Sequence, residues 1–222
     1  MTIKEVSAAI YNHVVTALQG YNANPTISLE QLEDEVVAER QQILKEYILN
    51  GVMNIDELYL SLNCVEVNCD YMSKCCNLPV GEKALHFEIP PIMNVSGGGQ
   101  IKFIGSIDRN TKYTVYTDDA YRYHKYKRIK NKTPYVYLDT SLNANGNMDG
   151  YIFNADLVKF ISVTALFADP RKLLEYDCCN DDDKYLEMGV LSNETIKRLS
   201  AKYLAWYKQA QTPVNYNTQQ PR

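Results

Sequence analysis

The sequence predicts an α+β fold. Its N- and C-terminal helices pack together, and its central region is antiparallel, β-rich and sandwich-like or barrel-like. Three observations carry this prediction. Capped segments with apolar residues at helical spacing stand near both ends. Short segments rich in β-branched and aromatic residues, separated by turn signals, fill the middle. The chain has 222 residues, 45% of them hydrophobic, which is enough for one sizeable core with a smaller lobe.

We expect four regions along the chain. Residues 1–62 form an N-terminal helical region, and residues 63–168 form a β-rich domain with a short helical insert. Residues 169–210 form C-terminal helices that pack on the N-terminal helices. Residues 211–222 form an extended tail, because they offer almost nothing to bury.

The N-terminal helices are announced by capping boxes at Thr2 with Glu5 and at Ser28 with Gln31, in which side chain and backbone satisfy each other's free donors. Asn50-Gly51 ends the second helix. A short helix is expected next, in "NIDELYLSL". The apolar positions at helical spacing are Ile3, Val6, Ile10, Val14 and Ala17 in the first helix and Leu29, Leu32, Val36, Ile43 and Tyr47 in the second.

Arg40 falls on the apolar stripe of the second helix. A long arginine at the rim of a core can bury its stem while its charge reaches water. The alternative is a charge presented to a partner chain, which makes Arg40 a candidate inter-subunit residue.

The central strands are expected in "VEVNC", "KALHFEIP", "IKFIGSID", "KYTVYT", "PYVYLD", "GYIF" and "VKFISVTALF", with turns at Asp108-Arg109-Asn110 and Asn145-Gly146-Asn147 among others. The stretch "TDDAYRYHKYKRI" is the expected helical insert. Helix returns at "DPRKLLEY", with Asp169 as N-cap and Pro170 in the first helical position. The last helix, Ser192 to about Ala210, is amphipathic, with Ile196, Leu199, Tyr203, Trp206 and Ala210 on its apolar face.

The six cysteines decide between several classes of site. Cys64, Cys69, Cys75 and Cys76 do not have the paired spacing of a zinc site, and the three histidines are scattered. The start "MTIKEVSAAI" has charge where a signal peptide needs an apolar run, so a disulfide framework is not expected. We therefore expect reduced thiols, no metal and no cofactor, and no apolar run approaches the roughly 20 residues of a membrane span.

No catalytic fingerprint is visible, so the chain is not expected to be an enzyme. "SGGGQIKF" lacks the Gly-Lys-Ser/Thr of a phosphate loop. "SLNANGNMDGYI" begins like a calcium loop, but its twelfth position is Ile152 instead of the bidentate glutamate. The acidic run at residues 181–183 is typical of a solvated loop or an N-cap.

One basic, aromatic stretch is a candidate contact surface for a channel or a partner. Within "YTDDAYRYHKYKRIKNK", cations alternate with tyrosines, a pattern in which cations contact phosphates and rings stack on bases. A solvated helix face with its tyrosines packed inward would show the same pattern. The candidate residues are Arg122, Lys125, Lys127, Arg128 and Lys130.

The tail carries a second candidate contact. Pro213 biases the residue before it toward extended geometry. Val214 and Tyr216 alternate with asparagines, which suits an added strand or an extended strip in a groove of another chain. We therefore take Pro213, Val214 and Tyr216 as partner-binding residues.

The order of several segments is distinctive: "LEDEVVAERQQILKEYILNG", then "CCNLPVG", "IKFIGSIDRNTKYTVYT", "VKFISVTALFADPRKLLEYD" and finally "QTPVNYNTQQ". It resembles structural proteins of tailed bacteriophages, particularly the neck-ring or head–tail adaptor proteins of crAss-like phages. The resemblance covers nearly the whole chain and rests on diffuse motifs. Relatives often end in an acidic tail, whereas this chain ends in "VNYNTQQPR", so a tail function that needs negative charge does not carry over.

The resemblance implies a non-enzymatic virion structural protein, a head–tail connector ring subunit that joins portal to tail and surrounds the DNA channel. It also implies a ring of twelve copies of this chain, with the portal and other ring or tail proteins as partners. DNA would pass without sequence-specific contacts and no membrane is involved. The protein would be made in the host cytoplasm and reside in the neck or tail of the virion. The alternative from a different class is a soluble nucleic-acid- or metal-binding module.

Overall fold

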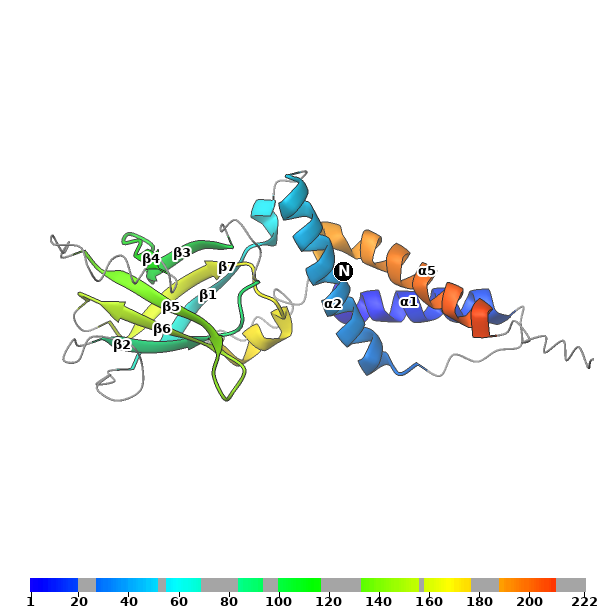
Figure 1. Cartoon of the computed structure of the whole chain (residues 1–222), viewed down its shortest axis with the longest axis horizontal. Coiled ribbons are helices and arrows are strands. Elements are labelled where there is room, and N and C mark those ends of the chain that lie inside the picture. Colours follow the sequence, from blue (N-terminus) through cyan, green and yellow to red (C-terminus); the bar gives the residue numbers. More distant parts are fainter. Residues whose placement is uncertain are drawn as a thin grey trace, which may run out of the picture. The chain divides into compact units, whose positions relative to one another are not determined.

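The computed structural model describes the chain at residues 1–19, 27–51, 55–68, 84–93, 100–116, 133–155, 158–176 and 188–210. The chain divides into two compact units, drawn in Figure 1. Met1–Glu46 and Glu187–Arg222 together form one, which we call the helical unit. Tyr47–Leu186 forms the other, which we call the sheet unit. The expected α+β class is confirmed.

Helix α1 (Ile3–Leu18) starts at the expected capping box. The Glu5 amide donates to Thr2 Oγ1 at 3.3 Å, and the Thr2 amide donates to Glu5 Oε2 at 2.9 Å. The buried face is formed by Ile3, Val6, Ser7, Ile10, Val14 and Leu18. Leu18 thus takes the position expected of Ala17, which is exposed. This face packs along α5 (Ser192–Ala210), so the expected contact between N- and C-terminal helices is confirmed.

Helix α2 (Leu29–Asn50) starts at the second capping box, in which the Gln31 amide donates to Ser28 Oγ at 3.2 Å. It ends where Gly51 adopts a left-handed φ of 61°, a conformation that glycine reaches without steric cost. Its buried residues are Leu32, Val36, Val37, Arg40, Ile43 and Leu44. Leu29 lies outside this face and is exposed.

Helix α5 is joined to α2 by charged side chains. The Arg198 guanidinium makes two bonds to Glu46, at 3.1 and 2.8 Å, and one to Glu194 at 2.6 Å, and it lies 3.6 Å from Glu39. The two-pronged geometry matches the fork of the guanidinium to both oxygens of one carboxylate. One turn further along α5, Lys202 pairs with Glu35 at 2.8 Å.

The sheet unit contains two separate sheets. One has the order β1-β7-β3, and the other has the order β2-β6-β5-β4. All neighbours are antiparallel except β4 and β5, which are parallel. The strands are β1 (Leu60–Glu66), β2 (Leu85–Ile89), β3 (Ile101–Ser106), β4 (Thr114–Tyr116), β5 (Tyr135–Leu142), β6 (Met148–Phe153) and β7 (Phe160–Ala165). Within the described residues this is a sandwich and not a closed barrel.

A single apolar layer fills the space between the two sheets. Strands β2, β5 and β6 alternate inward and outward residues, as the period of two requires. The layer comprises Leu62, Val65, Leu85, Phe87, Ile89, Ile104, Val136, Leu138, Met148, Ile152, Ile161, Val163 and Ala165, with neighbours at its edges. A second, aromatic cluster of Tyr135, Tyr151 and Phe153, with Ala84, comes from the outward positions of the same strands.

Two segments that were expected to be α-helices are 3-10 helices of the sheet unit. The helix expected in "NIDELYLSL" is a short 3-10 helix, Ile55–Leu58, and Leu60 begins β1. The spacing of two between Leu60 and Leu62 is typical of a strand. The expected helix at "DPRKLLEY" is a 3-10 helix, Pro170–Tyr176, whose start is capped by Asp169. It buries Leu173 in the sandwich core, and not on the N-terminal helices as expected.

Gly150 provides the first test of the sandwich. It is the cross-strand partner of Phe87, and a Cβ built on it would lie 2.1 Å from the Phe87 ring. We expect Gly150→Ala to lower the free energy of unfolding by about 1–3 kcal/mol, the usual cost of overpacking. Phe87→Leu in the same chain removes the ring and should recover part of that loss. Thermal unfolding measures both, with Thr114→Ala on the edge strand as control; an unchanged Gly150→Ala midpoint would contradict the packing.

Arg198 provides a test by pH. Its hydrogen bond lowers the pKa of Glu46 below the usual 4.5, with a further contribution from Gln42. The stabilisation is therefore complete above pH 4.5 and is lost as pH falls through the depressed folded-state pKa. We expect Arg198→Gln to remove this part of the acid dependence of unfolding, followed by far-ultraviolet circular dichroism. The control Lys197→Gln, at an exposed position of the same helix, should keep it; parallel acid profiles for all three proteins would be evidence against the pairing.

Candidate functional site

Among the residues expected to contact partners, the structure describes Arg40. It is 3% exposed, so the interpretation of a snorkelling arginine with its charge in water is wrong. A guanidinium at that depth requires hydrogen-bond partners. Its inter-subunit role stays a prediction. The basic stretch Arg122, Lys125, Lys127, Arg128 and Lys130 and the tail residues Pro213, Val214 and Tyr216 lie outside the described residues.

The helical unit has a groove of about 690 Å³ between the first turns of α2 and the last turns of α5. We call it the α2–α5 groove. It is lined by Ile27, Gln31, Asp34, Glu35, Lys202, Tyr203 and Trp206. The lining thus combines an aliphatic residue and two aromatic rings with carboxylates at one side.

The base of the α2–α5 groove is fixed by Glu35. Its carboxylate pairs with Lys202 Nζ at 2.8 Å and is hydrogen-bonded by the Tyr203 hydroxyl. Tyr203 is 8% exposed, and its burial, followed by the bond to Glu35, raises its pKa above the usual range. Trp206 differs: 53% of it is exposed, and its indole meets the Tyr207 ring edge-on at 4.8 Å between centroids.

Trp206 was expected on the buried face of α5 and lies outside it. The buried positions Thr195, Leu199, Tyr203 and Tyr207 follow each other at intervals of four. This row drifts slowly around a helix of 3.6 residues per turn, so Tyr207 falls on the face and Trp206 one position off it. The interval of four from Thr195 to Tyr207 is visible in the sequence and places Tyr207, and not Trp206, on the buried face.

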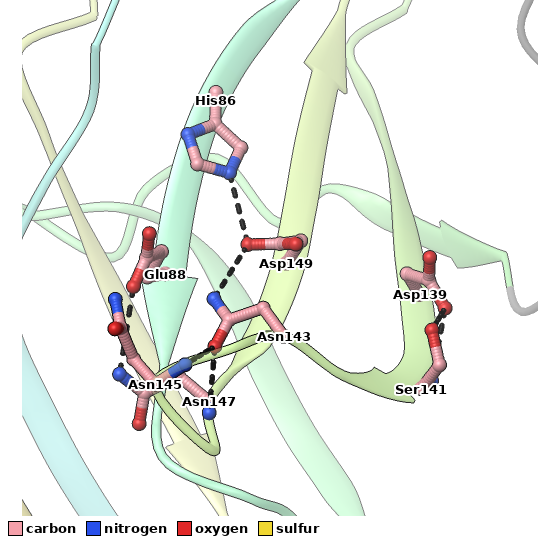
Figure 2. A network of polar contacts seen from close by, with 8 residues as sticks. All are labelled: His86, Glu88, Asp139, Ser141, Asn143, Asn145, Asn147 and Asp149. Atoms are coloured by element: carbon pink, nitrogen blue, oxygen red, sulfur yellow. Dashed lines mark hydrogen bonds and ion pairs between the residues drawn. The ribbon is translucent and has the colours of Figure 1, made fainter. Parts of the chain in front are cut away.

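The sheet unit carries a polar cluster on the outer face of its four-stranded sheet (Figure 2). His86 and Glu88 point outward from β2, and Asp149 points outward from β6, where it is the cross-strand partner of Glu88. His86 Nε2 lies 3.1 Å from Asp149 Oδ1. A carboxylate only accepts, so the proton of this bond is on Nε2.

The loop between β5 and β6 closes over this cluster. Asn143 Oδ1 accepts hydrogen bonds from the backbone amides of Asn145 and Asn147, both at 3.0 Å, and Gly146 supplies the left-handed φ of 74°. The side-chain amide of Asn143 also donates to Asp149 at 3.1 Å, and the side-chain amide of Asn147 donates to Glu88 at 3.4 Å (Figure 2). The asparagines that resembled a calcium loop therefore shape the turn of the hairpin, and two of them, Asn143 and Asn147, donate to Asp149 of β6 and Glu88 of β2.

An acidic pocket of about 350 Å³ adjoins the cluster. It is lined by Cys64, Glu66, Asn68, His86, Glu88, Glu175 and Tyr176. Burial, and then the charges of Glu88 and Glu175, raise the pKa of Tyr176 above its usual value. The carboxylates of Glu66, Glu88 and Glu175 make the lining of this pocket acidic.

His86, Glu88 and Asp149 could supply one ligand atom each to a metal ion, since these atoms lie within 4.8 Å of one another. Such separations also fit direct hydrogen bonds. The amide hydrogens of Asn143 and Asn147 point at the two carboxylates, and a cation there would repel them. The arrangement therefore favours a hydrogen-bonded support for the hairpin over a metal centre.

Cys64 corrects one expectation. It is disulfide-bonded, so the prediction that all the thiols are reduced is wrong for this residue. The other five cysteines lie outside the described residues. Spacing along the chain argued against a zinc site, but it does not report which sulfur atoms the fold brings together.

In the part of the chain that the structure describes, none of the helices is both long and apolar enough to cross a membrane.

A comparison with protein families gives one finding over nearly the whole chain. The model of a family described as phage tail ring protein 2 matches residues 9–220, which include parts of both units. No curated protein matches the sequence.

The metal-binding alternative can be tested at the polar cluster. We expect elemental analysis of the purified chain to find no stoichiometric zinc, manganese or calcium, because the carboxylates already accept amide hydrogens. The variant Asn143→Ala should lower the unfolding midpoint by loosening the hairpin, whereas Asn145→Ala, which keeps its backbone bond, should not. A stoichiometric metal that is lost in His86→Ala would instead make this cluster a metal centre.

Proposed function

Because the chain belongs to the phage tail ring protein 2 family, we propose that it is a head–tail connector ring subunit that joins the portal to the tail. Membership of the family makes it a structural protein of the phage tail ring, found in the virion and assembled with other tail components. The connector position and the DNA channel are our proposal. The observation that carries it is a family match that includes parts of both the helical and the sheet unit.

The proposed role is non-enzymatic. A ring subunit acts through shape and through contacts repeated around the ring, and it requires rigid elements to present them. The sandwich core and the Arg198 pairs support such rigidity in each unit. We propose twelve copies of the chain in the ring, with the portal and neighbouring ring or tail proteins above and below it.

The basic stretch is the proposed contact with the channel or with an acidic partner surface. It contains the cations Arg122, Lys125, Lys127, Arg128 and Lys130 in a chain whose net charge is −4. A local positive patch on an acidic protein acts through where it is placed and not through the total charge. Repetition around a ring would give a band of positive charge suited to a phosphate backbone that slides without sequence readout.

The tail is the proposed link to another chain. Pro213, Val214 and Tyr216 present two apolar side chains at a spacing of two, as an extended peptide does when it binds along an edge or groove. The contact would be weak for one copy and strong for many presented together. Arg40 stays a secondary inter-subunit proposal, although it is buried within the single chain.

Assembly tests the proposed function directly. We expect the purified chain, mixed with the portal protein of the same phage, to give closed rings stacked on the portal in electron micrographs. The purified chain without the portal protein is the control, and it shows whether rings form only when the portal is present. Monomers only, with the portal present and intact, would contradict the connector role.

The basic stretch gives a second prediction. Replacing Lys125, Lys127 and Arg128 with glutamine should leave the unfolding midpoint close to that of the unmodified chain, because exposed charges contribute little to stability. It should weaken ring assembly or DNA retention and reduce their dependence on salt. The control replaces Lys4, Lys45 and Lys208, which lie on helices of the helical unit. Equal salt dependence in both variants would show that the stretch is a solvated face.

A further inference from the structure

We propose that the α2–α5 groove is the receptor for residues 211–222 of a neighbouring copy of this chain. The inference rests on the proposed ring and deepens it, because it names both the segment and the surface that join adjacent subunits.

The groove has the chemistry of a peptide-binding surface. Trp206 is 53% exposed beside the buried Tyr203, and Ile27 lies opposite on the first turn before α2. A large exposed aromatic beside a hollow is a usual anchor of a protein interface, since its burial removes much apolar area from water. Asp34 and Glu35 give one side of the groove hydrogen-bond acceptors.

The tail offers the complementary groups. Val214 and Tyr216 are two residues apart, so in an extended chain their side chains point to the same side about 7 Å apart. Asn215 and Asn217 would point to the opposite side of the extended chain, so Val214 and Tyr216 are the side chains that we expect to enter the groove. Residues 211–222 contain no acidic side chain and one cation, Arg222, so they bring no like charge to the acidic side of the groove.

The position of the groove favours the tail of a neighbour over the chain's own. Trp206 precedes the last residue of α5, Ala210, by four positions, which is about 6 Å along the helix axis. Val214 follows Ala210 by four positions, so a return in the same chain requires a reversal within residues 211–213. Pro213 disfavours helical geometry at Thr212. We therefore take the tail of a neighbouring copy as the occupant of the groove.

Trp206 is the only tryptophan of the chain, so its fluorescence reports the groove alone. In the full chain we expect its emission to shift to shorter wavelength as protein concentration rises and neighbouring tails cover it. An emission maximum that is already at short wavelength at the lowest concentration, and stays the same as concentration rises, would mean that the tail occupies its own groove. That result would overturn the proposal.

A mixing experiment identifies the donor chain. The acceptor is the full chain with Val214→Ser and Tyr216→Ser, which keeps Trp206. The donor is the full chain with Trp206→Phe, which is silent and keeps the tail. We expect the acceptor emission to shift when the donor is added, and to stay unchanged with a control donor that carries Trp206→Phe, Val214→Ser and Tyr216→Ser. No shift with the intact donor, in proteins whose circular dichroism is unchanged, overturns the proposal.

This outcome is separate from that of the proposed function. Rings on the portal without any response of Trp206 to the donor would reject the groove and keep the connector role. A response of Trp206 to the donor without rings on the portal would reject the connector role and keep the groove.

Discussion

The apolar layer shared by the two sheets is the constraint on which the sheet unit depends. Strands β2, β5 and β6 must turn every second side chain into that layer. The Phe87 ring lies so close to its neighbour in the same sheet, Gly150, that this position has no room for a side chain. The residues between are thereby forced outward on one face. His86, Glu88 and Asp149 meet there because the pleat and the register leave them no alternative, and the asparagine-rich hairpin completes their hydrogen bonds. Core packing thus places the polar cluster on the outer face, where its carboxylates support the β5–β6 loop.

The helical unit is built on a different balance. Helix α1 packs on α5 through apolar side chains, whereas α2 meets α5 through the Arg198 and Lys202 pairs. The α2–α5 groove lies beside one of these pairs, with Glu35 serving both as ion-pair partner of Lys202 and as acceptor for Tyr203. A surface of this kind keeps its shape without being filled, which is what a docking groove requires.

Local signals in the sequence predicted most of the elements. Both capping boxes, the stop at Gly51 and six of the seven strands follow from spacing and turn chemistry within a few residues, whereas most of β1 falls in a segment expected to be helical. Relations over long distances were not readable: the pairing of β1 with β7, the parallel pairing of β4 with β5, and the disulfide of Cys64 depend on which segments the fold brings together. The face of α5 was predicted correctly at Leu199 and Tyr203, but Trp206 was placed on it where the structure has Tyr207.

The order of the two units along the chain has a consequence for synthesis. The helical unit is discontinuous: its first part, Met1–Glu46, is separated from its last, Glu187–Arg222, by the whole of the sheet unit. On the ribosome the sheet unit can therefore close first, while α1 waits for α5 for on the order of ten seconds at ordinary elongation rates. Until α5 is made, Lys202, Tyr203 and Trp206 are missing from the lining of the α2–α5 groove. The groove can therefore form only after the whole sheet unit has been synthesised.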